Sequence, residues 1–283
     1  MAVRIITDSS SDLPFSCQEK WGITILPLRV LFGEEEYVDG QDLTAEQFYA
    51  KLAQAKELPK TAQVTPAEFE DAMRPFVQAG DEIVVLPISR ELSGTSASAR
   101  IAREQFPQAE IYVIDTLAVT FGLGMLVEIA VRLRDQGMTA REIAEKLDKL
   151  KSRARLYAVI DDLKYLRLGG RLSTAGAMVG TLLGIKPIVS IEEGKVCSVD
   201  KARGLKAGYQ AILERVKKEG VDTAYPTYFG HSNLPSAMRD LQALIAPQME
   251  LDISQGCDIG PIVGTHAGPG CTGIAFIARE TAE

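Results

Sequence analysis

The sequence predicts an α/β protein of two domains, the first with a mostly parallel sheet and the second with a mixed or antiparallel sheet. Strand-like and helix-like segments alternate through the first half, an order that builds a parallel sheet with helices on its faces. The second half contains a hairpin that turns at Glu193-Gly194, together with further strand and helix segments. With 283 residues, 46% of them apolar, the chain is long enough for about two domains of roughly 150 residues each.

The first half begins with a strand and continues as alternating elements. The segments expected to form strands are residues 3–7, 82–87 and 110–114, together with a hairpin of residues 23–32 and 34–38 that turns at Gly33. The segments expected to form helices are residues 13–21, 45–55, 67–78, 94–105, 121–135 and 140–151. We place the domain boundary near residues 151–155, which gives an amino-terminal domain of residues 1–152 and a carboxy-terminal domain of residues 153–283.

The second half has a different order of elements, which includes a hairpin. Its expected strands are residues 156–160, a hairpin of 186–191 and 195–199 that turns at Glu193-Gly194, and residues 224–230, 249–253 and 272–278. Its expected helices are residues 163–168, 174–183, 205–218 and 235–245. The helix at 174–183 mixes small with large apolar residues, so it suits either a core or the wall of a channel for an aliphatic tail.

Composition excludes several classes of function. The net charge of −7 argues against nucleic-acid binding, which depends on Lys and Arg at the phosphates, and gives no support to a polybasic membrane anchor. No apolar stretch reaches the roughly 20 residues that span a bilayer, and the amino terminus lacks the apolar core of a signal peptide. Four cysteines without C-x-x-C spacing and two histidines make a zinc or iron–sulfur site unsupported. We expect a cytoplasmic, monomeric protein with reduced thiols and no cofactor.

The segment from Gly260 to Gly270 is the most informative stretch. It places His266 among four glycines and two prolines, residues that allow close backbone approach and stiffen turns. A loop of this kind suits recognition of a small polar or anionic group, and a tight structural turn fits equally well. Gly268, Gly270 and Gly273 also match G-x-G-x-x-G, but they lead into a strand-like run and the acidic residue expected about 20 positions later is missing, so we reject NAD or FAD binding.

Two hydroxyl-bearing segments are candidates for binding an anion. Ser93 and Thr95 flank a glycine at a predicted helix start, where hydroxyls and free backbone N–H groups occur together, although an ordinary helix cap explains them as well. Thr61 lies in an extended stretch before a capping box at Thr65 and Glu68, and its hydroxyl could point into a cleft.

Asp8 and Arg171 have simpler structural explanations. Asp8 follows the first strand, where ligands often bind in open α/β sheets, but helix capping by Ser10 or Ser11 explains that segment better than a phosphotransferase carboxylate. Arg171 follows Gly169-Gly170 and could face an anion or an acidic partner, although a solvated arginine is the commoner outcome. The other histidine, His231, has no assigned role.

Together these segments resemble the DegV family of bacterial fatty-acid-binding proteins. The resemblance runs in family order over nearly the whole chain. Its matching segments are Thr7-Asp8-Ser9 with Asp12-Leu13-Pro14, Thr61–Pro66, Leu92-Ser93-Gly94-Thr95 with Ser98, Asp115-Thr116 before Gly122 and Gly124, Gly169-Gly170-Arg171-Leu172-Ser173, Lys186-Pro187-Ile188, and Gly260-Pro261 with Gly264, His266 and Gly268-Pro269-Gly270. The sequence departs from the family at residues 62–65 and 96–98, both near the expected headgroup, which leaves chain selectivity and the details of the carboxylate contacts open.

The resemblance implies a long-chain fatty acid held between two α/β domains, with its tail in an apolar tunnel of the carboxy-terminal domain. Thr61 and Ser93 would donate hydroxyl hydrogen bonds to the carboxylate, and His266 would lie beside it. Thr95, Arg171, Gly268 and Gly270 would contact the headgroup region or a partner. The family also implies presentation of the carboxylate to a separate fatty acid kinase, which forms an acyl phosphate for phospholipid synthesis.

Two kinds of alternative to this non-catalytic carrier remain, an enzyme and a protein without a ligand. The same cleft could belong to a serine esterase that uses Ser93 with His266, or to a phosphotransferase that uses Asp8, and an esterase would need a base oriented by an acid and an oxyanion hole. The protein without a ligand would be a signalling or interaction module.

Overall fold

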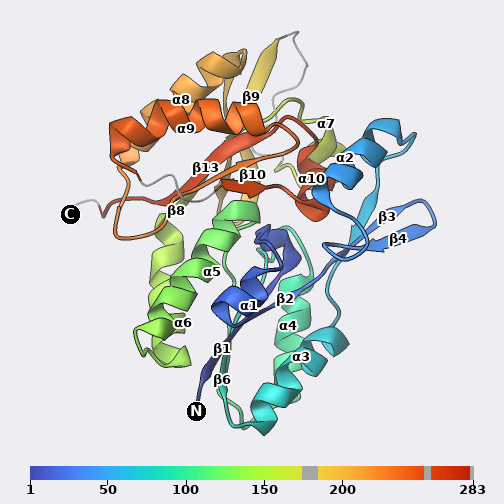
Figure 1. Cartoon of the computed structure of the whole chain (residues 1–283), viewed down its shortest axis with the longest axis vertical. Helices are drawn as coiled ribbons and strands as arrows, with labels where there is room; N and C mark the ends of the chain where they lie inside the picture. The colour runs from blue at the N-terminus through green and yellow to red at the C-terminus, as the bar shows by residue number, and fades with distance from the viewer. Residues whose placement is uncertain (174–183, 252–255, 281–283) are drawn as a thin grey trace.

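The computed structural model describes residues 1–173, 184–251 and 256–280, and within these residues the strands form three sheets (Figure 1). One is a wholly parallel sheet of four strands, one a mixed sheet of six, and one a small antiparallel sheet of three. The predicted fold class, a parallel sheet followed by a mixed α/β half, is confirmed.

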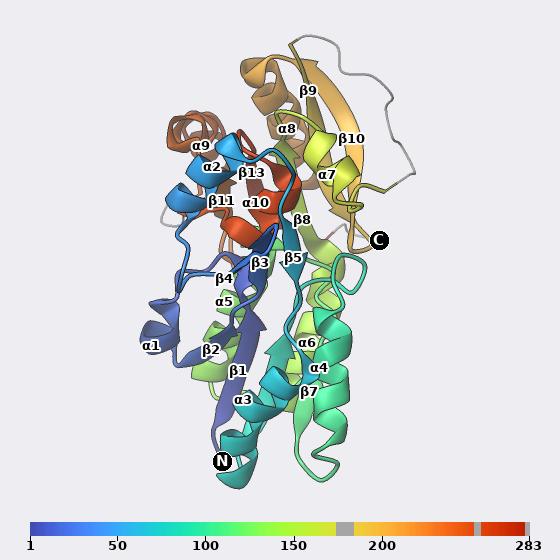
Figure 2. The ribbon, with the colours of Figure 1, turned by 90° about the vertical axis from the view of Figure 1, so that its right-hand side faces the viewer.

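The parallel sheet has the order β2-β1-β6-β7 and helices on both faces. Its strands are β1 (Val3–Asp8), β2 (Ile23–Leu26), β6 (Glu82–Leu86) and β7 (Ile111–Val113). Helices α5 (Thr120–Asp135) and α6 (Ala140–Leu150) contact one face, while α3 (Pro66–Gln78) and α4 (Thr95–Glu104) contact the other (Figure 2). Successive strand residues point to opposite faces, so Ile5 shares an apolar cluster with α5 and Ile6 shares one with α3.

The mixed sheet has the order β10-β9-β8-β13-β11-β12. Its strands are β8 (Ala154–Val159), β9 (Ile185–Glu192), β10 (Lys195–Arg203), β11 (Tyr228–His231), β12 (Gly256–Asp258) and β13 (Thr272–Ile277). Helices α8 (Leu205–Glu219) and α9 (Pro235–Met249) pack on its outer face through a cluster that contains Tyr157 and Val159. Leu156 and Ala158 point the other way and join the cluster of α5. That cluster contains residues from both sides of residue 152. The division into domains of residues 1–152 and 153–283 therefore stays a prediction.

The expected hairpin of residues 23–38 is wrong in its first strand. Residues 23–32 form two strands in different sheets, β2 in the parallel sheet and β3 (Arg29–Phe32) in the antiparallel one, where β3 pairs with β4 (Glu35–Val38) and with the unforeseen strand β5 (Lys60–Ala62). Pro27 separates them, because proline has no N–H to donate to a strand ladder. The turn at Gly33 is as expected, with φ of 63°.

The segment expected to be a loop at Gly260–Gly270 contains a helix, α10 (Pro261–Ala267). Pro261 occupies its first turn and Gly268, at φ 71°, follows its end, the usual placement of these two residues around a helix. At Gly264 a Cβ would lie only 2.6 Å from the Tyr49 hydroxyl oxygen, so this glycine lets α10 pack closely on α2 (Ala45–Gln54).

Three other expected elements differ or cannot be compared. Of residues 13–21, only α1 (Cys17–Trp21) is helical, and the 3₁₀ helix η1 (Ser9–Ser11) lies before the expected segment. The strand expected from residue 249 is wrong at its start, since Met249 ends α9 and Glu250 caps that helix at φ 54°. The rest of that strand from residue 252 and the helix expected at 174–183 lie outside the described residues. The remaining helix that bears on the site, α7 (Lys164–Leu168), lies where the sequence predicted it.

Candidate functional site

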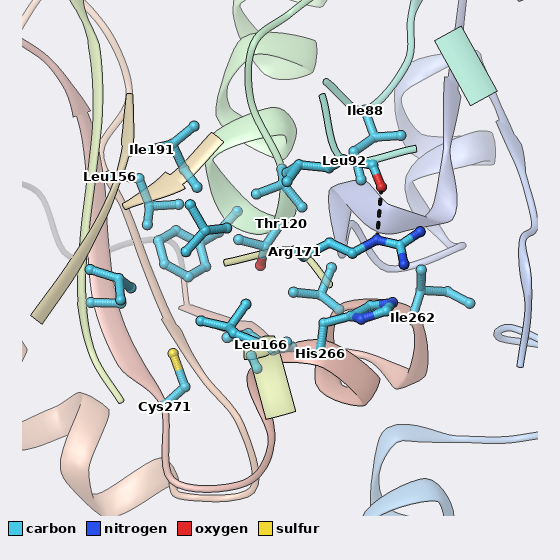
Figure 3. A pocket seen from close by; sticks show the side chains of 18 of the residues that line it. Ile88, Leu92, Thr120, Leu156, Leu166, Arg171, Ile191, Ile262, His266 and Cys271 are labelled. Atoms are coloured by element: carbon cyan, nitrogen blue, oxygen red, sulfur yellow. Dashed lines mark hydrogen bonds between the residues drawn. The ribbon is translucent and has the colours of Figure 1, made fainter. Parts of the chain in front are cut away.

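An apolar cavity lies between the inner face of the mixed sheet, the start of α5 and helix α10 (Figure 3). Its volume is about 90 Å³. Aliphatic side chains of β8, β9 and β10 form one wall, and the opposite side comes from α7, α10 and the loop after β6. The lining residues are Leu28, Thr61, Ile88, Leu92, Ser93, Val119, Thr120, Phe121, Leu156, Ala158, Ile160, Leu166, Arg171, Val189, Ile191, Val196, Ile259, Ile262, Val263, His266, Ala267 and Cys271.

The cavity is polar at one end. In Figure 3, Arg171 and His266 lie together on one side, while Leu156, Ile191 and Cys271 lie on the other. Thr61, Arg171 and His266 also line a second pocket of about 560 Å³, whose other walls include Glu57, Lys60, Thr265 and the backbone at Gly169. These three side chains therefore mark the place where the apolar cavity meets a polar pocket.

Thr61 and His266 meet although they are 205 residues apart in the sequence. Thr61 lies on β5 and His266 near the end of α10, with 3.1 Å between Thr61 Oγ1 and His266 Nε2. Burial, reinforced by the positive charge of Arg171, lowers the pKa of His266 to about 4. The imidazole is therefore neutral at physiological pH. Its Nδ1 is buried without a hydrogen-bond partner in the described structure and faces Gly169, where a Cβ would approach it to 2.3 Å.

The lowered pKa of His266 predicts a pH-dependent contribution to stability. Between about pH 6.5 and about pH 4 the unfolded chain binds a proton at this side chain that the folded chain does not, so acidification favours unfolding over this window. His266→Gln, which cannot titrate, is expected to lose less unfolding free energy than the wild type between pH 7 and pH 4. Urea titrations at several pH values measure the difference. Parallel pH profiles for the two proteins would contradict a buried, neutral His266.

Arg171 has its guanidinium held at the junction of the two pockets. Its Nε donates to the Leu92 carbonyl at 3.2 Å and its Nη1 donates to the Gly169 carbonyl at 2.7 Å (Figure 3 shows the first bond). Within the described ranges it forms no ion pair with a carboxylate. A guanidinium fixed by two carbonyls keeps its positive charge available for an anion at the polar end of the cavity.

Ser93 lines the cavity from the loop after β6. Its Oγ lies 2.9 Å from Thr95 Oγ1 and accepts a hydrogen bond from the Thr95 N–H at 3.3 Å. Thr95 is fully buried at the first position of α4 and, among the described residues, does not line the cavity. The hydroxyl of Ser93 is thus turned to Thr95, while the Nε2 of His266 is turned to Thr61.

Asp8 serves as a cap. Its two carboxylate oxygens accept hydrogen bonds from the N–H and hydroxyl of Ser10 and from the N–H of Ile88. Burial raises the pKa of Asp8, and among the described residues it lines neither pocket at the site. The sequence was right that this segment caps a helix but wrong about the capping residue: Asp8 itself caps η1, and α1 begins after Ser16 without a side-chain cap from Ser10 or Ser11.

Gly268 and Gly270 lie beside the site, and the described lining of both pockets omits them. Both have positive φ, 71° and 81°. A Cβ would approach the Tyr165 ring to 2.3 Å at Gly268 and the Asp161 side chain to 3.0 Å at Gly270. Gly268 lets the chain turn closely past Tyr165 of α7, and Gly270 lets it pass Asp161, which precedes that helix. Contact with a headgroup or a partner remains a prediction for both glycines.

Some residues around the cavity could not be identified from sequence patterns. Thr120 and Cys271 line it, yet neither stands in a recognisable motif. Such positions depend on contacts between distant segments.

Among the described helices, none has the length and apolar character needed to cross a bilayer.

Comparison with known proteins gives consistent similarities. Residues 2–279 match the model of a family described as uncharacterised proteins of the DegV family. A DegV domain-containing protein of Caldanaerobacter subterraneus subsp. tengcongensis is 33% identical over 275 residues, which cover 97% of this chain and 98% of the relative.

Two solved structures resemble the whole chain. A DegV family protein from Thermus thermophilus, described for its fatty acid binding, has a TM-score of 0.90 at 29% identity and covers 99% of this chain and 100% of its own. A fatty acid binding DegV family protein from Streptococcus agalactiae has a TM-score of 0.89 at 30% identity, with the same coverage.

Proposed function

This chain belongs to the DegV family, and from that premise we propose that it binds a long-chain fatty acid and presents the carboxylate to a partner kinase. The acyl tail occupies the apolar cavity, and the carboxylate lies at its polar end near Thr61, Ser93 and His266, with Arg171 in reach. The protein itself acts as a carrier in this proposal.

The observation that carries the proposal is an aliphatic cavity that ends at the polar side chains Thr61, Arg171 and His266. Each methylene buried there contributes about 0.8 kcal/mol. A carboxylate without partners would be costly to bury, and the hydroxyls and the guanidinium at this end provide donors for it. A neutral His266 can donate one N–H without adding a buried charge.

The cavity volume adds a condition on binding. About 90 Å³ is small beside the roughly 300–1,000 Å³ typical of sites for drug-sized ligands. A long acyl chain therefore requires the aliphatic walls to move apart. We expect ligand binding to shift the side chains on β8 and β9 relative to those on α5 and α10.

The polar pocket supports presentation to a kinase. Its volume of about 560 Å³ outside Thr61 and His266 leaves a carboxylate at the junction reachable from the surface. In the proposed reaction a carboxylate oxygen of the bound fatty acid attacks the γ-phosphorus of ATP on the kinase. ADP leaves, and an acyl phosphate forms while its acyl tail stays in the cavity.

This step is tested with palmitate-loaded protein, ATP and the fatty acid kinase of a bacterium that carries DegV proteins. Hydroxylamine converts an acyl phosphate to a hydroxamate, so palmitoyl hydroxamate is expected only when the kinase is present. No hydroxamate from this protein, in an assay where the same kinase works with its own DegV partner, would contradict presentation to that kinase.

Hydrolysis of p-nitrophenyl esters separates the carrier from the esterase. The carrier is expected to show no turnover above the buffer rate, and Ser93→Ala is expected to weaken palmitate binding about tenfold through loss of one hydrogen bond to a charged group. Turnover that disappears in Ser93→Ala would replace the carrier proposal with an esterase.

A further inference from the structure

Asp12 joins three segments that are distant in the sequence. Its Oδ2 accepts a hydrogen bond from the Thr120 hydroxyl at 2.6 Å, and its Oδ1 accepts one from the Gly260 N–H at 2.9 Å. Its carbonyl oxygen accepts the Cys257 thiol hydrogen at 3.0 Å. These bonds span 108, 248 and 245 residues of sequence. Asp12 is absent from the described lining of the acyl cavity, so it lies behind the wall.

Thr120 is in a strained backbone conformation on that wall. It lines the cavity as the first residue of α5, and its φ is 52°. β-Branched residues rarely adopt the left-handed region, and they do so where surrounding contacts hold them, often at functional sites. The hydroxyl of this residue donates to Asp12, a bond that anchors the side chain and satisfies its one polar group.

Gly260 connects the same carboxylate to the other side of the cavity. It is the N-cap of α10, the helix that carries the cavity-lining residues Ile262, Val263 and His266. In Figure 3, Thr120 lies on the α5 side of the cavity and Ile262 and His266 on the α10 side. One carboxylate therefore binds the starts of two of the helices that line the cavity, α5 and α10.

We propose that Asp12 is a positioning residue for fatty-acid binding, which fixes the starts of α5 and α10 relative to each other and holds the Thr120 hydroxyl out of the acyl cavity. The inference rests on the proposed function. Without Asp12, the Thr120 hydroxyl and the Gly260 N–H lose their partner. The acyl chain then meets an unsatisfied polar group in a wall whose shape is no longer fixed.

Thr120→Ala and Thr120→Ser form a matched pair, since both remove the methyl group and only alanine removes the hydroxyl. Palmitate affinity, measured by calorimetry on delipidated protein, is expected to fall about tenfold in Thr120→Ala and to stay near the wild-type value in Thr120→Ser. Asp12→Ala is expected to lose at least as much affinity. Asp12→Asn can still accept the Gly260 N–H and hydrogen-bond to Thr120, and it is expected to retain most of the affinity.

A stability control separates positioning from general destabilisation. Asp81 is also buried and hydrogen-bonded, to the Ala2 N–H and to Arg4, but it lies among the residues around the amino terminus and outside the cavity lining. Asp81→Asn is expected to lower the unfolding free energy without changing palmitate affinity. When Asp12→Ala and Thr120→Ala are combined in one protein, their losses of palmitate affinity are expected to combine less than multiplicatively, because both variants remove the same hydrogen bond.

If the wild type binds palmitate, any of three results would overturn the inference. The first is equal palmitate affinity in Thr120→Ala and Thr120→Ser, and the second is a multiplicative loss of affinity in the double variant of Asp12→Ala and Thr120→Ala. The third is a loss of palmitate affinity in Asp81→Asn that matches its loss of stability. A wild type that binds no palmitate would instead overturn the proposed function on which the inference rests.

Discussion

Replacing Ala158 with phenylalanine is expected to lower the affinity for palmitate by a factor of about 100 or more. Ala158 is 2% exposed on β8 and its side chain lines the acyl cavity. A phenyl ring there occupies the space of several methylenes, and displacing about four of them at about 0.8 kcal/mol each accounts for a loss of this size. Calorimetry with palmitate measures the loss. A shorter fatty acid is expected to be affected less.

Ala211→Phe provides the control for this variant. Ala211 is half-buried on α8, in the cluster outside the mixed sheet, so the same ring is added away from the cavity. We expect Ala211→Phe to bind palmitate like the wild type even if its stability falls. Unchanged affinity in Ala158→Phe, with the protein folded, would show that the tail does not lie against β8.

Arg171→Met is expected to weaken palmitate binding about 10- to 100-fold, the range for losing a hydrogen bond to a charged group at about 1.5–3 kcal/mol. The methionine keeps an apolar stem beside the cavity and removes the charge. Methyl palmitate, which has no negative charge, is expected to bind wild type and variant equally. Comparing the loss of affinity for palmitate with that for methyl palmitate therefore isolates the contribution of the charge.

Arg171→Lys is the companion variant, since it keeps the charge but loses the planar fork that bonds the carbonyls of Leu92 and Gly169. Its palmitate affinity is expected to lie between those of the wild type and Arg171→Met. If Arg171→Met weakened palmitate and methyl palmitate by the same factor, Arg171 would shape the site without binding the carboxylate.

Local sequence patterns were sufficient for the parallel sheet and the mixed sheet as a fold class but did not predict the three-stranded antiparallel sheet. The alternation of strands and helices specified the parallel sheet, because each apolar run had a helix beside it in sequence to cover it. Residues 23–32 read as one strand, yet Pro27 divides them between two sheets. The helix Pro261–Ala267 was not predicted because its segment is rich in glycine, a residue typical of loops. Gly264 within the helix packs closely against Tyr49, and Gly268 just after it packs against Tyr165.

The site shows the same limit. Thr61, Ser93, Arg171 and His266 were identified from motifs and family resemblance, and the structure places all four around one cavity. Their individual roles toward a carboxylate stay predictions. Asp12 and Thr120 could not be paired from sequence, since their bond spans 108 residues and the strained φ of Thr120 leaves no trace in composition.

Mass spectrometry of an organic extract from the purified, denatured protein tests fatty-acid binding most directly. We predict a long-chain fatty acid in an amount equimolar with the chain, and its identity would report the preference for length and unsaturation under the conditions of expression. An extract without lipid, together with no uptake of added palmitate by the folded protein, would contradict the carrier function.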